Sequence, residues 1–316
     1  MAKKHIKKST TSSKATTRKI SQRRYASFRL QKRVKHPGNL AKTRRILSSA
    51  HRHVWQHKRL FFGIVLVYAI LTVVLVSGFG LVSELEDIRA IIDELIEGQF
   101  GQIASGAAVL SLLISNTVSA PTEVASLYQT ILFVLVSLAI IWSLRQTYAK
   151  ESPALRDAFY LGMYPVIPFI FVLVIIGLQL VPFAIGSWLF TTVTTGGLAV
   201  TFVEQLLWLT LFFLLTVLSL YMISSSLFAL YIVTLPDMRP MQALKSAREL
   251  VRFRRWTVLR KVLFLPFALS IIGLIVLLPM AIFTVPIAIV VTILLYSLLC
   301  VLYAHAYMYE LYRELL

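Results

Sequence analysis

Long uncharged apolar runs alternate with short polar segments through most of the chain after residue 59. A helix needs about 20 consecutive apolar residues to cross the hydrocarbon core of a bilayer. Six runs reach this length, at about residues 60–82, 124–144, 159–188, 204–233, 262–283 and 286–308. The pattern therefore predicts an all-α, polytopic membrane protein with six transmembrane helices in a domain that covers residues 60–316.

Prolines fall inside two of the predicted spans. Pro165, Pro168 and Pro182 lie in the third span, and Pro266 and Pro279 lie in the fifth. Because proline cannot donate a backbone hydrogen bond and its ring crowds the preceding turn, we expect these positions to kink the two helices.

Residues 1–59 form a basic segment before the first apolar run. They contain 19 Lys and Arg residues and no Asp or Glu. The first part, to about residue 19, is too polar to bury a core, so we expect it to be disordered. Further along, Leu47, Ala50 and Val54 recur at helical spacing among basic residues. This spacing predicts an amphipathic helix that lies on the membrane and leads into the first span.

Charge sets the expected orientation of the spans. Lys58 and Arg59 immediately precede the first span, and short basic segments stay in the cytoplasm. Residues 84–97 carry six acids against Arg89 and predict an external acidic helix. Residues 105–116 are too short to cross and are interpreted as a buried or re-entrant piece. Six crossings then leave both termini cytoplasmic in a cell membrane.

Two apolar segments are similar to each other. Residues 168–185 and 266–282 both begin with Pro-Phe and end with Pro-x-Ala-Ile. This similarity favours a tandem helical-hairpin repeat, in which spans three and four correspond to spans five and six.

Residues 235–261 form a polar island between the fourth and fifth spans. The island holds eight of the 13 Lys and Arg residues that follow Arg59. Pro240 suits a first helical turn, and apolar and basic positions alternate at helical spacing, which predicts a cytoplasmic basic helix over 239–261. We expect seven of its cations to contact anionic headgroups or a partner: Lys245, Arg248, Arg252, Arg254, Arg255, Arg260 and Lys261.

The same island carries a resemblance to a known family. The residues that match the family's pattern are Pro240, Ala243, Leu244, Ser246, Leu250, Val251, Arg255 and Trp256. In this spacing the segment resembles the membrane domain that accompanies glycerophosphodiester phosphodiesterases, and its stand-alone six-span relatives. The family usually has Lys-Gly where this chain has Arg252 and Phe253, so the turn there differs. The soluble catalytic barrel is absent here, and the resemblance implies a membrane module rather than an activity.

Composition agrees with a membrane protein. Hydrophobic residues make up 58% of the chain and charged residues 15%, with a mean hydropathy of +0.77. A soluble domain has about half apolar and a quarter charged residues. The net charge of +18 belongs to the basic tail and the island, because the chain after Arg59 carries 13 basic and 14 acidic residues. The single cysteine, Cys300, cannot form an intramolecular disulfide.

Few residues suggest chemistry. His51, His53 and His57 have no thiolate or carboxylate nearby in sequence and are interpreted as interface residues rather than a zinc site. The serines at 224–226 are interpreted as helix-packing residues, and His305 is placed at the end of a span. We therefore expect no enzymatic activity, no metal and no cofactor.

The leading hypothesis is a non-enzymatic multi-pass membrane protein that serves lipid organisation or envelope scaffolding. Its basic cytoplasmic face would engage anionic headgroups of the lipid bilayer or a cytoplasmic protein partner. Two alternatives stay open. One is a transporter or permease-like protein for an apolar or lipid-like substrate. The other is a membrane anchor for nucleic acid or ribosomes through residues 1–59, because Lys and Arg interleaved with aromatic residues suit phosphates and bases.

Overall fold

The computed structural model describes residues 41–76, 123–197, 201–283 and 286–316. The chain divides into two units, Met1–His36 and Pro37–Leu316, and all described residues belong to the second. The expected disordered segment, the external acidic helix at 84–97 and the re-entrant piece at 105–116 lie outside the described residues.

Every regular element in the described part of the chain is a helix, which confirms the all-α prediction. Six helices are long and apolar enough to span a membrane, and the fourth span continues from α8 into the short α9 (Ala229–Ile232). The six are α2 (Lys58–Leu75), α5 (Glu123–Tyr148), α7 (Val166–Thr195), α8 (Phe202–Ser226), α11 (Arg255–Phe283) and α12 (Pro286–Leu315). The shorter helices are α1 (Thr43–Gln56), α6 (Leu155–Gly162) and α10 (Pro240–Val251).

The third spanning helix begins and ends later than predicted. The chain from residue 159 to Gly162 belongs to α6, and Pro165 occupies the N-cap position of α7. Residues 189–195, which follow the predicted third span, continue α7. Threonine hydroxyls are satisfied within that helix, because Thr194 Oγ1 donates to Phe190 O at 2.8 Å and Thr195 Oγ1 to Thr191 O at 2.7 Å. The turn follows at Gly196 and at Gly197, whose φ of +67° favours glycine.

The predicted basic helix at 239–261 is two helices. α10 ends at Val251, and Arg252 N and Arg254 N donate to carbonyls three residues earlier, at 3.3 and 2.9 Å. These tight bonds close a turn, after which α11 begins at Arg255. The spanning helix therefore starts inside the basic segment, where long basic side chains can extend from an apolar helix toward water.

The five prolines fall into two groups. Pro165 and Pro168 lie at the beginning of α7, where the first backbone N–H groups need no helical partner, so they begin the helix instead of kinking it. Pro182 lies inside α7, and Pro266 and Pro279 lie inside α11. These three positions each remove one helical hydrogen bond.

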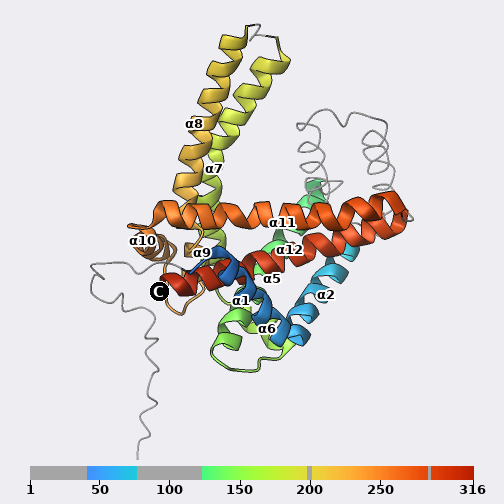
Figure 1. Cartoon of the computed structure of the whole chain (residues 1–316). Helices are drawn as coiled ribbons and strands as arrows, with labels where there is room; N and C mark the ends of the chain where they lie inside the picture. The colour runs from blue at the N-terminus through green and yellow to red at the C-terminus, as the bar shows by residue number, and fades with distance from the viewer. Residues whose placement is uncertain (1–40, 77–122, 198–200, 284–285) are drawn as a thin grey trace, which may run out of the picture. The chain divides into compact units, whose positions relative to one another are not determined.

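Two helical hairpins form the second half of the chain, α7 with α8 and α11 with α12 (Figure 1). Ser219 Oγ of α8 donates to Gln179 O of α7 at 2.7 Å. In the other hairpin, the Tyr296 hydroxyl donates to Leu269 O, and the same ring lies against Gly273. The two similar segments each lie in the first helix of a hairpin, and the repeat itself stays a prediction.

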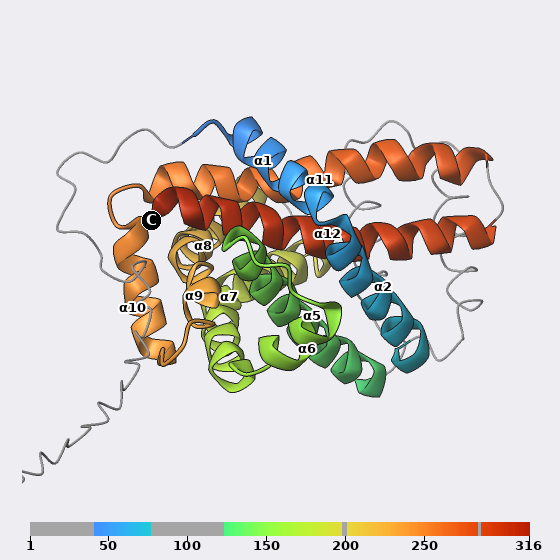
Figure 2. The ribbon, with the colours of Figure 1, turned by 90° about the horizontal axis from the view of Figure 1, so that it is seen from below.

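The core is formed by α1, α2, α5 and α12, which pack on one another, and it extends through α7 to α9 and α10. Figure 2 shows α1 crossing α12 and leading into α2. Side chains from these helices are buried together, among them Val54, Phe61, Leu138, Phe228 and Leu302, each no more than 1% exposed.

Gly186 tests the close contact between α7 and α8. A Cβ there would lie 3.1 Å from the Leu215 side chain and 3.3 Å from Phe212. Gly186→Val should overfill this contact and lower stability by about 1–3 kcal/mol. Thermal unfolding in detergent measures the change. Gly177 lies in the same helix with nothing within 4 Å of its Cβ position, so Gly177→Val is the matched control. If both substitutions lowered the stability equally, the close contact at Gly186 would be contradicted.

Candidate functional site

α1 places polar side chains against the ends of three other helices. Its apolar stripe is Ile46, Ala50 and Val54, which are 2%, 1% and 0% exposed. α1 is an amphipathic helix, and its apolar face packs against the protein, chiefly α12, whereas the sequence predicted a helix lying on the membrane. Because this stripe is buried inside the bundle, α1 has no second apolar stripe that could face lipid. We call this region the α1 end of the bundle.

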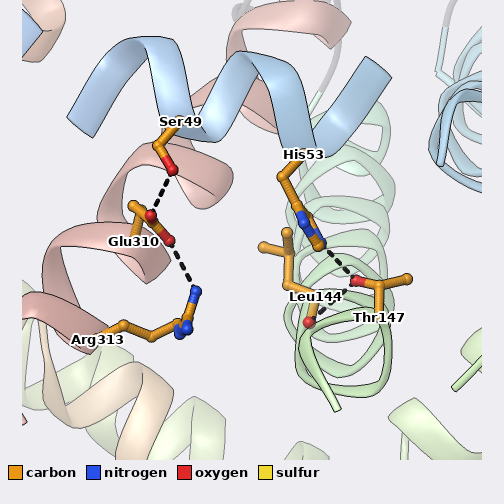
Figure 3. Close-up of polar contacts among 6 residues, drawn as sticks. All are labelled: Ser49, His53, Leu144, Thr147, Glu310 and Arg313. Carbon is orange, nitrogen blue, oxygen red and sulfur yellow. Dashed lines mark hydrogen bonds and ion pairs between the residues drawn. The ribbon is translucent and has the colours of Figure 1, made fainter. Parts of the chain in front are cut away.

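Glu310 is the central charge at the α1 end (Figure 3). This carboxylate is 9% exposed. Ser49 Oγ of α1 donates to Glu310 Oε1 at 2.6 Å, and Arg313 Nη1 lies 3.2 Å from Oε2. The Arg313 guanidinium also lies 4.0 Å from the centre of the Tyr148 ring of α5. A buried carboxylate is stable only with such partners, so Glu310 links α1, α5 and α12.

His53 makes the second contact of α1 in Figure 3. Its Nε2 lies 2.8 Å from Thr147 Oγ1, and its ring stacks on Tyr148 with centroids 3.7 Å apart. The single hydroxyl hydrogen of Thr147 points to backbone carbonyls, Ser143 O at 2.9 Å among them. Thr147 Oγ1 therefore accepts, and His53 Nε2–H donates.

The same surroundings keep His53 neutral at neutral pH. The pKa of His53 is lowered from 6.5 to about 4, chiefly by burial and also by the nearby His57 and Arg313. The Glu310 carboxylate acts against them and raises it. Protonation would place a cation in a half-buried site that already holds Arg313.

The other two histidines of α1 have different neighbours. His51 Nδ1 lies 3.0 Å from the Tyr303 hydroxyl, and the two rings stack with centroids 5.8 Å apart. His57 lies beside His53, with centroids 5.0 Å apart. Within the described ranges, no three His, Cys, Asp or Glu side chains are grouped as a metal site would require.

A second polar chain lies deeper in the bundle, and the sequence did not predict it. His305 Nε2 lies 3.0 Å from Ser137 Oγ of α5, and its Nδ1 lies 3.1 Å from the Tyr231 hydroxyl of α9. The placement of His305 at a span end was wrong, because α12 continues to Leu315. Ser137 and His305 have the spacing of a nucleophile and its base. Ser137 is only 1% exposed, and the pair links α5 to α12 inside the bundle.

Two basic residues serve as anchors between segments. Arg145 Nη1 donates to Thr234 O at 2.8 Å, and Arg145 also bonds the Thr234 hydroxyl. Lys261, expected to contact headgroups, is 6% exposed. Its Nζ donates to Ala41 O just before α1, and its own carbonyl accepts from the Tyr307 hydroxyl at 3.0 Å. Lys261 therefore holds the start of α1 against α11.

The remaining six predicted cations lie where α10 turns into α11. Lys245, Arg248, Arg252 and Arg260 are exposed, and Arg254 and Arg255 are partly buried. Arg255 is held over the Tyr221 ring of α8, 4.8 Å from its centre.

Two exposed aromatic residues lie among them, Phe253 at 80% and Trp256 at 70% exposure. We call these six cations and two aromatic residues the basic corner.

The fold and these contacts define the class of the protein, an all-helical multi-pass membrane protein. No protein-family model matches the chain, and no curated protein or solved structure is significantly similar to it. The resemblance of residues 240–256 to the membrane domain that accompanies glycerophosphodiester phosphodiesterases stays a prediction.

The low pKa of His53 predicts a pH-dependent contact. A group whose pKa is lower in the docked state than in the free state favours docking above its free pKa. Docking of α1 should therefore be constant above about pH 7 and weaken as the pH falls from 6.5 toward 4, by about 30-fold at pH 5. Spin labels at Ser48 of α1 and Glu314 of α12, both exposed, report docking as a distance distribution.

His53→Gln keeps a hydrogen-bond donor for Thr147 and removes the titration, so it serves as the control. The wild type should show more undocked α1 at about pH 5 than at about pH 7.5, and the variant should show no difference. An equal pH response in both proteins would assign the effect to another group.

Proposed function

We propose that this protein is a non-enzymatic multi-pass membrane protein whose basic corner binds anionic lipid headgroups on the cytoplasmic side of the cell membrane. Its role would be lipid organisation or envelope scaffolding. The observation that carries the proposal is the mixture of exposed cations and exposed aromatic side chains at the point where α10 meets a spanning helix.

The cations of α10 share one side of the helix. Lys245, Arg248 and Arg252 follow one another at spacings of three and four residues, which places them on one face. On the opposite side, Ala243 and Ala247 are 0% exposed. Between residues 240 and 261 the single acid is Glu249. The face is therefore strongly positive and available to anions.

The aromatic residues support a lipid partner over a fully aqueous one. Trp and Phe with large exposed surface are favourable at the level of the headgroups, where one side is apolar and the other is wet. A shallow hollow beside them is lined by Trp256, Thr257, Leu259, Arg260 and Leu263. An apolar floor next to Arg260 suits the glycerol and upper acyl region below an anionic headgroup.

The magnitude of the electrostatic attraction is sufficient for enrichment of anionic lipid. Each basic residue near an anionic surface contributes about 1 kcal/mol. Four exposed cations, with Arg254 and Arg255 partly exposed beside them, would then favour anionic over neutral headgroups by more than tenfold. The resemblance of this segment to a membrane domain associated with glycerophosphodiester phosphodiesterases agrees with a lipid-related role.

The test uses the whole protein in nanodiscs that contain neutral and anionic phospholipid. After detergent extraction, the ratio of anionic to neutral lipid that stays bound is measured by mass spectrometry. The variant Lys245→Gln, Arg248→Gln, Arg252→Gln and Arg260→Gln should lower this ratio by about tenfold or more, because it removes the exposed charges of the basic corner.

The matched control removes four exposed charges elsewhere, by Lys42→Gln, Arg44→Gln, Arg45→Gln and Arg52→Gln in α1. The control should keep the lipid ratio of the wild type. If both variants lose the same amount of anionic lipid, or neither loses any, the basic corner is not the lipid site.

A further inference from the structure

We infer that the outer face of α1 is a docking surface for single-stranded RNA, a function separate from lipid binding at the basic corner. The surface consists of Lys42, Arg44, Arg45, Ser48 and Arg52, and we call it the α1 basic face. All five side chains are exposed. Together with Ser49 they line a shallow hollow.

α1 does not present these cations as a helix embedded in the bilayer surface does. Such a helix buries an apolar face among the lipids and keeps its cations at the headgroups. In α1 the apolar face is occupied, because Ile46, Ala50 and Val54 are at most 2% exposed within the bundle. What remains on the outside is cationic and hydroxylic apart from the aromatic rings of His51 and Trp55, and this mixture suits a polyanion in water.

The spacing and the type of the cations fit a nucleic-acid strand. Lys42 and Arg52 are ten residues apart, about 15 Å along the helix axis. The phosphates of one nucleic-acid strand are about 3.4 Å apart along its axis, so about four fall within this length. Three of the four cations are arginines, whose planar guanidinium donates two parallel hydrogen bonds to a phosphate.

An aromatic stack lies on α1 beside the cations. Trp55 is 56% exposed and stacks on His51, with centroids 6.0 Å apart and planes inclined by 24°. His51 stacks in turn on Tyr303, at 5.8 Å and 13°. Lys58 lies 5.6 Å from the centre of the Trp55 ring. An exposed aromatic face next to a positively charged groove is how proteins bind unpaired bases.

These contacts favour RNA over a lipid headgroup, which has no flat ring to stack on Trp55, and over an acidic peptide without aromatic residues. The sequence adds to the charge, because residues 1–59 contain 19 Lys and Arg and no acid. Phosphates on the α1 basic face and a base on Trp55 would thus be bound together. Single-stranded RNA satisfies both requirements, whereas paired bases are stacked on each other and cannot reach a side chain.

The test measures binding of a fluorescent homopolymer RNA of about 12 nucleotides to the full-length protein in neutral nanodiscs, over a range of salt concentrations. The variant Arg44→Gln, Arg45→Gln and Arg52→Gln should weaken binding by tenfold or more. It should also reduce the slope of log K against log salt by about 2, because each lost contact to a single strand contributes roughly 0.7.

Trp55→Leu separates stacking from charge. It should weaken binding by about tenfold and leave the salt slope unchanged. Photo-crosslinking with a thiouridine-containing RNA should place a crosslink in the peptide that holds His51 and Trp55. The distance measurement between α1 and α12 verifies that α1 stays docked in each variant.

The matched charge control is Lys245→Gln, Arg248→Gln and Arg252→Gln in the basic corner, which should bind RNA like the wild type. Unchanged RNA binding in the α1 variants, or crosslinks confined to residues 1–40, would overturn the inference. If the Trp55→Leu variant bound RNA as tightly as the wild type, binding would depend on charge alone, and the inference would be overturned as well. Loss of anionic lipid instead of RNA from the α1 variants would make the face a lipid surface. The lipid assay measures binding at the basic corner and the RNA assay measures binding at the α1 basic face, so either proposal can fail while the other stands.

Discussion

The packing of α1 across the helix ends is the constraint on which the rest of the account depends. Its apolar part is Ile46, Ala50 and Val54, whose burial contributes several kcal/mol at about 1.5–3 for each large side chain. The hydrogen bond from Ser49 to the Glu310 carboxylate adds about 1.5–3 kcal/mol, as bonds to charged groups do. Apolar burial therefore provides most of the attraction. Glu310 instead fixes the position of α1, because only one placement adds the Ser49 hydroxyl to Arg313 as a second donor to the buried carboxylate.

The α1 basic face and the basic corner differ in the side chains that they expose. The apolar residues of α1 are buried in the bundle, and its cations and serines are exposed to water, with Trp55 at one side. The basic corner has its small residues, Ala243 and Ala247, against the protein, and keeps Phe253 and Trp256 exposed among its cations. Charge alone does not distinguish the two surfaces. The exposed aromatic area among the charges is larger at the basic corner, and we propose lipid for that corner and a polyanion in water for the α1 basic face.

The sequence predicted the parts of this arrangement that depend on composition and local periodicity. Six spans follow from apolar length, and the amphipathic α1 and α10 follow from helical spacing. Helix ends were less predictable, because Thr191 to Thr195 and the arginines at the start of α11 are polar but still join helices. The polar contacts could not be predicted from local patterns, because their partners are distant along the chain. Ser49 and Glu310 are 261 positions apart, and His53 and Thr147 are 94 apart. For the same reason Lys261 looked like a surface cation, when its partner is the carbonyl of Ala41.

Hydrogen–deuterium exchange of the full-length protein in nanodiscs tests the docking of α1 most directly. A docked α1 predicts slow exchange of the amides from Ile46 to Gln56, comparable with the end of α12, because its helical hydrogen bonds open only when the buried stripe leaves the bundle. Exchange of these amides within seconds, while the end of α12 stays protected, would contradict the account.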